Sequence, residues 1–303
     1  MGSKRNIRLV LSYDGTEFSG WQRQDKDRSV QGELEAALEK MHGRPVPTIG
    51  AGRTDSGVHA MGQVANFYTD IANIEAGRFL PALNRLLPRD LRVLSASDAD
   101  FDYHSRYDAR LRRYRYFVAC GRSIDPMRLR YAHQLLRRPS LEALNAAASV
   151  ILGETDFTTF SAAQDVSVNR SRFVHESSWR WEGDMLVYQV AANAFLWRMV
   201  RSLVGSMLYY EGWAASCVGC PVEGEAFGDD SRGRAISSEA ERTDLCGRRM
   251  AAALAAKDRS LAGPTAPARG LFLWNVEYYA SPTRPGRGDY WSVGKEGPST
   301  SLP

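Results

Sequence analysis

The sequence predicts an α+β fold of two halves, each an antiparallel sheet with helices on one face. Two observations predict it. Segments in which apolar and polar residues alternate recur in both halves, which is typical of half-buried strands. Segments with apolar residues at helical spacing lie between them, but the strict strand–helix alternation of a parallel sheet is missing. With 303 residues, 44% of them hydrophobic, the chain is long enough to bury a sizeable core.

The first half, residues 1–105, is predicted to contain five elements. They are a strand over 7–13, a helix over 30–42, a strand over 63–68, a helix over 79–87 and a strand over 91–94. Ser29 can cap the first helix and Gly43 can end it. Pro88 stops the second helix, because proline lacks the backbone N–H that a helix interior uses.

The second half, residues 106–280, repeats this mixture after a boundary near Ser105. Its expected elements are a strand over 113–119, a helix over 141–152, strands over 178–182 and 185–191, a helix over 195–210 and a strand over 271–279. Ser140 can cap the first of these helices. Gly183 and Asp184 join the paired strands as a hairpin.

Two segments break the pattern. Residues 212–244 are acidic and rich in Gly and Ser, and a loop of this length is typical of an insertion. Within them Ser238 and Glu241 form a capping box that restarts a helix through Leu254. The tail over 281–303 is dense in Pro, Gly and Ser and is predicted to be disordered.

The positive charge of the chain is concentrated. Its net charge is only +4, but residues 78–138 hold fourteen arginines against six aspartates, a local net charge of +8. Tyrosines are interleaved with these arginines. Guanidinium groups bind phosphates and stack on bases, so the segment is a candidate surface for RNA or DNA. The alternative is a general arginine bias that places guanidinium groups on any solvated face.

The rest of the composition excludes several classes. No apolar run is long enough to span a membrane, and the first residues do not form a secretory signal. Four cysteines in so long a chain indicate a reducing cytoplasm rather than a disulfide scaffold. Cys217 and Cys220 could bind zinc together with Cys246, but unrelated thiols are the favoured interpretation because no second close pair exists. The histidines show no metal-binding spacing either.

The segment 50–60 contains the densest chemistry, Gly-Ala-Gly-Arg-Thr-Asp-Ser-Gly-Val-His-Ala. Three glycines permit a tight backbone that other residues resist. Such a loop suggests a site built around Asp55, with Arg53 and His59 beside it. The alternative is a turn in which Asp55 bonds its own backbone. Arg53 could also be an ion-pair partner of Asp55.

The chain resembles the bacterial tRNA pseudouridine synthase A (TruA) family along nearly its whole length. The blocks that carry the resemblance occur in the family's order: Tyr13-Asp14-Gly15-Thr16 with Phe18, Gly20, Trp21 and Gln22; Val30-Gln31-Gly32; 52–60 with Gly62-Gln63-Val64; Arg112-Arg113-Tyr114-Arg115-Tyr116; Asp156-Phe157 with Phe160; Asn193-Ala194-Phe195; Met199-Val200-Arg201 with Val204-Gly205; and Gly263-Pro264-Thr265-Ala266-Pro267 with Gly270-Leu271. A lone Gly-Arg-Thr-Asp would mean little, but these blocks together are specific.

The resemblance implies two ferredoxin-like (RNP-like) halves with antiparallel sheets joined around a central active-site cleft, with Asp55 at its floor. It implies conversion of uridine to pseudouridine in the anticodon stem-loop of tRNA, at positions 38–40. The base is cut from C1′, rotated and rejoined through carbon, without a cofactor or metal. The partners implied are tRNA and a second copy of the chain in a cytoplasmic homodimer, with no membrane.

The resemblance also assigns roles to residues. Asp55 is the catalytic carboxylate, as nucleophile or as base, and Arg201 accompanies it. Tyr114 packs against the target base, and Arg53 enters the RNA where the uridine leaves. Asp14, Gln63 and His59 support the loop. By residue type alone, Tyr114 would be an ordinary core residue of a strand and Arg201 an arginine on a helix surface.

Two other classes compete with this interpretation. A non-catalytic RNA-binding or tRNA-chaperone protein could use the same fold and the same basic face. The set of Asp55, Tyr114 and Arg201 argues against it. An acidic-site hydrolase would need a second carboxylate or a metal cluster, and none lies near Asp55 in the sequence.

Overall fold

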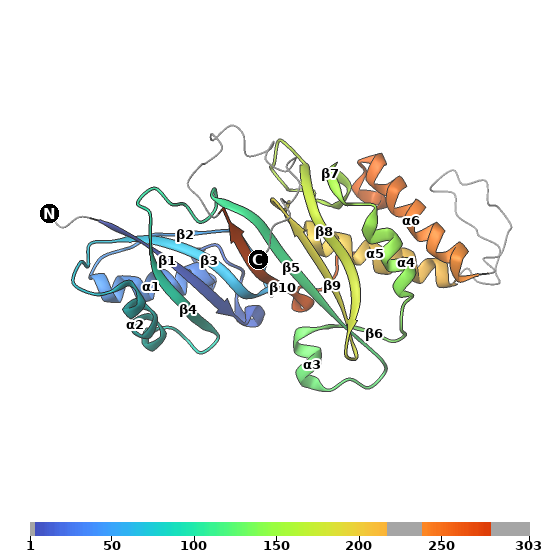
Figure 1. The fold of residues 1–303 in the computed structure, drawn as a ribbon. Helices are drawn as coiled ribbons and strands as arrows, with labels where there is room; N and C mark the ends of the chain where they lie inside the picture. Colours follow the sequence, from blue (N-terminus) through green and yellow to red (C-terminus); the bar gives the residue numbers. More distant parts are fainter. Residues whose placement is uncertain (1–3, 217–237, 280–303) are drawn as a thin grey trace, which may run out of the picture. The chain divides into compact units, whose positions relative to one another are not determined.

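The computed structural model describes residues 4–216 and 238–279 (Figure 1). Its elements are those of an α+β protein, as predicted. The chain divides into two compact units, Met1–Leu135 with Pro267–Tyr279 and, among the described residues, Leu136–Ala266. The boundary predicted near Ser105 therefore falls inside the first unit.

The first unit is built on a sheet with strand order β4-β1-β3-β10-β5. Two short strands extend it, since β2 pairs with β3 and β6 pairs with β5. Neighbours are antiparallel except for the pairs β10–β3 and β5–β6. The strands are β1 (Arg5–Tyr13), β2 (Thr48–Gly50), β3 (His59–Thr69), β4 (Leu91–Ala99), β5 (Ala109–Cys120), β6 (His133–Leu135) and β10 (Leu271–Tyr278).

The last strand explains why the unit boundary differs from the predicted one. β10 runs parallel to β3, with Phe272 opposite His59, and antiparallel to β5, with Leu273 opposite Tyr114. The end of the described chain therefore lies between two early strands, and it joins β5 to the unit that contains β3. A boundary placed from local composition does not detect such a long-range pairing.

Two helices pack together in the first unit (Figure 1). The helix α1 (Val30–His42) begins at the Ser29 cap, whose hydroxyl accepts from Gly32 N–H, and ends at Gly43 with φ 67°. The His42 ring lies 6.2 Å from the ring of Phe67 on β3 and 6.4 Å from that of Phe79. Phe79 begins α2 (Phe79–Leu86), so these rings join both helices to the sheet. A third helix, α3 (Pro126–Tyr131), was not predicted.

Among its described residues, the second unit has three antiparallel strands and three α-helices. They are β7 (Gly153–Asp156), β8 (Ser171–Glu182), β9 (Met185–Ala192), α4 (Leu141–Ser149), α5 (Met199–Ser216) and α6 (Glu239–Ala256). Trp179 of β8 shows how the layers meet. Its backbone pairs with the Asn145 side chain of α4, and its indole N–H points to the sulfur of Met207 on α5 at 3.2 Å.

Some predicted bounds change. The helix expected over 195–210 begins at Met199, because Arg198 has φ 59° and cannot continue a right-handed helix. Of the predicted insertion 212–244, the first residues belong to α5 and those from Glu239 on belong to α6. Cys217 and Cys220 lie outside the described residues, as does the tail 281–303, whereas Cys246 is buried in the second unit.

Short 3-10 helices complete the described part of the chain: Gly15–Glu17, Ala76–Arg78, Thr158–Phe160, Arg259–Leu261 and Ala268–Gly270. Within residues 4–216 and 238–279, no helix combines the length and apolar character needed to cross a membrane.

Candidate active site

Asp55 lies on the loop 51–58, which connects β2 to β3 and is held by a second segment of chain. Trp21 N–H donates to the Thr54 carbonyl at 3.1 Å, and Gly57 N–H donates to the Phe18 carbonyl at 3.2 Å. Between them Gly20 has φ 95°, and a Cβ there would lie 2.6 Å from the Thr54 carbonyl oxygen. Only glycine fits, so the two segments can lie side by side.

The end of β1 supports the same loop from another side. The hydroxyl of Tyr13 bonds to Thr54 Oγ1 at 2.9 Å. Burial raises the pKa of Tyr13 to about 12, so the hydroxyl stays protonated at neutral pH. A Cβ on Gly15 would lie 2.0 Å from the Val58 carbonyl oxygen. The residues on both sides of Asp55 are therefore packed against backbone and buried side chains.

Two further side chains hold the start of the loop. Gln63 Nε2 donates to the Gly52 carbonyl at 2.8 Å, and an Arg112 Nη donates to the Ala51 carbonyl at 3.0 Å. Burial lowers the pKa of Arg112, and its guanidinium donates to backbone carbonyls rather than facing solvent. Gln63 was predicted to support the loop. The contribution of Arg112 was not, because its arginine-rich surroundings suggested RNA contact.

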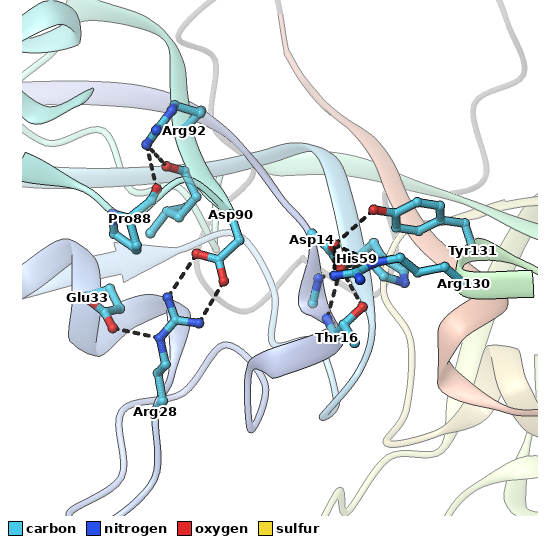
Figure 2. A network of polar contacts seen from close by, with 12 residues as sticks. Asp14, Thr16, Arg28, Glu33, His59, Pro88, Asp90, Arg92, Arg130 and Tyr131 are labelled. Carbon is cyan, nitrogen blue, oxygen red and sulfur yellow. Dashed lines mark hydrogen bonds and ion pairs between the residues drawn. The ribbon is translucent and has the colours of Figure 1, made fainter. Parts of the chain in front are cut away.

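Asp14 is the centre of the polar network in Figure 2. Its Oδ1 accepts from the N–H of Thr16 at 3.1 Å and from the Thr16 hydroxyl at 2.6 Å. Its Oδ2 accepts from Arg130 at 2.8 and 3.1 Å and from the Tyr131 hydroxyl at 2.9 Å. The carboxylate therefore ties the end of β1 to α3, which follows more than a hundred residues later.

The charge of Asp14 is stabilised by this network. Burial alone would raise its pKa, but the hydrogen bonds from Thr16, Arg130 and Tyr131 outweigh burial and hold the pKa well below its usual range. A carboxylate that accepts several hydrogen bonds and faces a guanidinium is a rigid anchor. It is also an ill-suited proton acceptor, which favours a supporting role over a chemical one.

His59 is buried beneath the loop, with 1% of its surface exposed. Its Nδ1 accepts a hydrogen bond from Gly15 N–H at 3.0 Å, and its ring stacks on Phe272 at 4.6 Å. Burial lowers the pKa of His59, although the nearby Asp14 charge opposes the shift. The lowered pKa favours a neutral ring, whose Nδ1 also lies 3.2 Å from Asp14 Oδ1. This arrangement suits hydrogen bonding that shapes the loop.

Tyr114 and Asp55 come together within the first unit. Tyr114 lies on β5 and is buried. It pairs with Leu273, which pairs in turn with Ala60 just after the loop. Burial raises the pKa of Tyr114, and the Tyr13 and Asp55 groups raise it further while Arg112 opposes them. The Asp55 carboxylate thus lies within electrostatic reach of the Tyr114 hydroxyl.

The two arginines of the predicted site differ in setting. Arg53 is exposed and, among the residues described, has no hydrogen bond or ion pair, so the ion pair with Asp55 considered above is not observed. Arg201 belongs to the second unit. Its Nε donates to the Ala266 carbonyl at 2.8 Å, and its own carbonyl accepts from Ala266 N–H at 3.0 Å. These bonds hold Arg201 at the 263–267 segment.

The arginine-rich segment 78–138 is only partly available to a ligand. Several of its guanidinium groups bond within the protein: Arg92 to backbone carbonyls, Arg112 to Ala51, Arg113 to Glu277, Arg128 to Asp125, Arg130 to Asp14 and Arg137 to Glu211. The charge count therefore overestimates the surface offered to RNA. Within the described ranges, no three His, Cys, Asp or Glu side chains are grouped so as to hold a metal ion.

The chain is similar to known proteins over most of its length. A family model described as tRNA pseudouridine synthase matches residues 9–108 and 147–279. The tRNA pseudouridine synthase A of Treponema denticola is 43% identical over 281 residues, which is 91% of this chain and 94% of the relative. The chain belongs to the tRNA pseudouridine synthase family. The Bacillus subtilis tRNA pseudouridine synthase A is 36% identical and covers 90% of this chain and 98% of its own length.

The activity of the tRNA pseudouridine synthase family is an isomerisation, the conversion of uridine to pseudouridine in tRNA. Sequence reasoning did not identify Arg112, which bonds the Asp55 loop, or Arg130 and Tyr131, which bond Asp14. A signal existed for Arg112, which opens one of the blocks that resemble the family. None existed for Arg130 and Tyr131, since they reach Asp14 only through the fold.

Proposed function

We propose that this chain converts uridine to pseudouridine in the anticodon stem-loop of tRNA, at positions 38–40, with Asp55 as the catalytic carboxylate. The observation that carries the proposal is the placement of Asp55. It lies on a loop held from several sides, within electrostatic reach of the buried Tyr114. A catalytic group needs this kind of fixed geometry, because small displacements cost large factors in rate.

The roles that we propose for the other residues follow from where they lie. The Tyr114 ring provides a face against which the uracil can pack. Arg53 is exposed and available to enter the RNA and to offset part of the cost of extruding a base. Arg201, which the Ala266 carbonyl holds in the second unit, contributes to substrate binding, as the family resemblance implies. Gln63 bonds the loop that carries Asp55, and Asp14 and His59 support it by holding the turn 14–16, which packs against Val58.

The reaction itself needs little beyond these groups. The bond between the uracil N1 and C1′ breaks, the base turns, and a ring carbon forms the new bond to C1′. That carbon loses a proton and N1 gains one, so the atoms balance without a donor or an electron carrier. A single carboxylate can serve either as nucleophile toward the substrate or as base. We further propose that the enzyme acts in the cytoplasm as a homodimer in which both protomers contact one tRNA.

The test compares two aspartates at opposite ends of one strand. Asp55→Ala removes the proposed catalytic group just before β3. Asp70→Ala removes an exposed carboxylate just after β3, where it pairs with Arg44 at 2.8 Å. We expect Asp55→Ala to bind tRNA and to form no pseudouridine, and Asp70→Ala to match the wild type. Pseudouridine mapping on tRNA and equilibrium binding measure the two properties.

Each other outcome has a clear meaning. Undiminished product from Asp55→Ala would refute the role of Asp55. Product found only outside the anticodon arm would refute the proposed position and leave the chemistry intact. A wild-type protein that binds tRNA and makes no pseudouridine would favour the competing function, an RNA-binding or tRNA-chaperone protein on the same fold.

A further inference from the structure

The loop 162–170 of the second unit displays two aliphatic side chains to solvent. Val166 is 94% exposed and Val168 is 103% exposed. Single exposed apolar residues are common, but two fully exposed valines on one short loop give up the free energy that burial would provide. Such a loop is typical of a surface that a ligand covers.

The loop is held in shape rather than left loose. Asp165 Oδ2 accepts from the N–H of Trp197 at 2.6 Å, and its Oδ1 accepts from Ser167 N–H at 2.7 Å. Ala162 N–H donates to the Trp197 carbonyl at 2.9 Å. An Arg170 Nη donates to the Asp165 carbonyl at 3.2 Å. These bonds fix the valine loop against the turn that contains Trp197.

That turn displays an aromatic ring and a guanidinium. Trp197 is 43% exposed, and the guanidinium carbon of Arg198 lies 5.2 Å from the centre of a Trp197 ring. Arg198 has φ 59°, a conformation that costs free energy in a residue with a side chain. This left-handed residue ends the turn, and both Trp197 and Arg198 are exposed just before α5 begins at Met199.

The charge of the two segments selects the class of ligand. Residues 162–172 and 193–201 hold one carboxylate, Asp165, and four arginines. Arg172 is buried against backbone carbonyls, and Arg170 and Arg201 bond oxygens within the unit, so the exposed Arg198 supplies the positive charge of this surface. That carboxylate is already occupied by two backbone N–H groups. A surface that combines an exposed indole, exposed aliphatic groups and positive charge suits a ligand with apolar flat faces and negative charge. Unpaired RNA has both.

We propose that Val166, Val168, Trp197 and Arg198, the Val166/Trp197 surface, bind an unpaired segment of the substrate RNA. Trp197 stacks on one base, Arg198 pairs with a phosphate, and the two valines cover the apolar face of a neighbouring nucleotide. The inference rests on the proposed function in one respect, namely that the substrate is a tRNA with an unpaired loop. It adds residues of the second unit to Asp55, Tyr114 and Arg53 of the first.

The experiment measures equilibrium binding of an unmodified tRNA transcript to the full-length protein. We expect Trp197→Ala and the double variant Val166→Ser/Val168→Ser each to raise Kd about fivefold or more, as for the loss of a stacked base. Trp197→Phe should keep most of the affinity. The matched control is Leu152→Ser, since Leu152 is also an exposed aliphatic residue of the second unit, at 46%.

Two further readouts separate this role from a structural one. In Trp197→Ala, Kd should depend on salt as it does in the wild type. In Arg198→Ala, the slope of log Kd against log salt should fall by about 1, the value for one lost phosphate contact. In a stem-loop with 2-aminopurine at an unpaired position, the wild-type protein should change the fluorescence more than Trp197→Ala does. Val166 and Val168 are fully exposed, so thermal unfolding should stay unchanged in the valine double variant.

The outcomes distinguish this inference from the proposed function. Unchanged Kd in both Trp197→Ala and the valine double variant would overturn the surface, whether or not the wild type makes pseudouridine. Equal loss of affinity in Leu152→Ser would overturn it as well. A wild type that makes no pseudouridine, with Kd still dependent on Trp197, would refute the proposed function and leave the RNA surface standing.

Discussion

Two irregular loops of this protein carry exposed or reactive groups, and they are held in different ways. The loop 51–58 with Asp55 is bonded by four separate parts of the first unit, namely Tyr13, the segment 18–21, Gln63 and Arg112. Most of these bonds reach its backbone. The loop 162–170 is held largely by its own residues: the Asp165 carboxylate accepts two hydrogen bonds, the Arg170 guanidinium donates to the Asp165 carbonyl, and Ala162 N–H bonds the Trp197 carbonyl.

The difference matches the tasks that we propose for them. A group that takes part in bond breaking must be held within a fraction of an ångström, and redundant backbone bonds achieve that. A surface that stacks on RNA tolerates adjustment, because any base offers a flat face. We therefore expect the loop 51–58 to be sensitive to substitutions that disturb its close packing. We expect the loop 162–170 to be sensitive to removal of the Asp165 carboxylate.

The largest expected effect comes from disturbing the close approach at Gly20. Gly20→Ala places a Cβ too close to the Thr54 carbonyl oxygen, and alanine rarely adopts the φ of 95° that this position requires. We expect pseudouridine formation to fall at least about a hundredfold, since a displaced catalytic loop loses its alignment. Unfolding should become easier by about 1–3 kcal/mol, from overpacking and backbone strain together. Single-turnover kinetics and urea denaturation measure the two effects.

The control is another glycine with positive φ. Gly43 has φ 67°, and a Cβ there would meet nothing within 4 Å. Gly43→Ala should cost about 1 kcal/mol of backbone strain and leave the catalytic rate unchanged. Equal loss of activity in the two variants would show that general stability, rather than the fit of the Asp55 loop, determines the rate.

A smaller effect is expected at Asp14, which anchors the same unit from outside the loop. Asp14→Asn removes the charge that accepts from Arg130 and Tyr131. We expect a tenfold loss in kcat/KM, about 1.4 kcal/mol, and a loss of stability of about 1–3 kcal/mol. Asp90→Asn is the control, because Asp90 pairs with Arg28 at 2.7 and 2.9 Å in the neighbouring cluster (Figure 2). It should lower stability and leave kcat unchanged.

The pH dependence of stability sharpens this prediction. The folded pKa of Asp14 lies below its unfolded value, about 3.9. Its contribution to stability is therefore fully present above about pH 4 and is lost as pH falls through the folded pKa. Asp14→Asn should flatten the acid branch of the stability curve in that window. An unchanged acid branch would mean that the network around Asp14 does not stabilise the fold.

Sequence patterns predicted the elements whose signals are local. The Ser29 cap and Gly43 end α1 as expected, and alternation located β1 and the β8–β9 hairpin. Short elements without such periodicity were not predicted: β2, α3, β6 and β7. Their positions depend on pairing with distant strands or on packing, which local residue spacing does not record. The strand β10 was predicted, but its position between β3 and β5 was not.

The candidate site shows the same division. Residue types and the family resemblance identified Asp55, Tyr114, Arg53 and the supporting Asp14, Gln63 and His59, whose roles stay predictions. Arg130 and Tyr131 could not be found, because they reach Asp14, and the Tyr131 ring reaches His59, only when the chain is folded. Charge counting also misjudged Arg112, since a buried guanidinium that bonds backbone carbonyls contributes nothing to a surface.

The smallest expected effect concerns the loop 162–170. Asp165→Ala removes the acceptor for Trp197 and Ser167 N–H and frees the valine loop from its turn. We expect Kd for tRNA to rise about fivefold, with a loss of stability of about 1–2 kcal/mol. Because the carboxylate acts through the valines, combining Asp165→Ala with Val166→Ser/Val168→Ser should add little to either change alone.

Asp156→Ala provides the matched control for this last prediction. Asp156 forms the same kind of local turn, accepting from the N–H and hydroxyl of Thr158 at 2.9 and 2.6 Å, but it presents no exposed valines. It should lower stability to a similar extent and leave Kd unchanged. Fully additive losses in the combined Asp165 variant would mean that Asp165 contributes to RNA binding in some way other than by holding the valine loop. The contrast between the loop 51–58, which several parts of its unit hold, and the loop 162–170, in which the Asp165 carboxylate places the valines, would then be wrong.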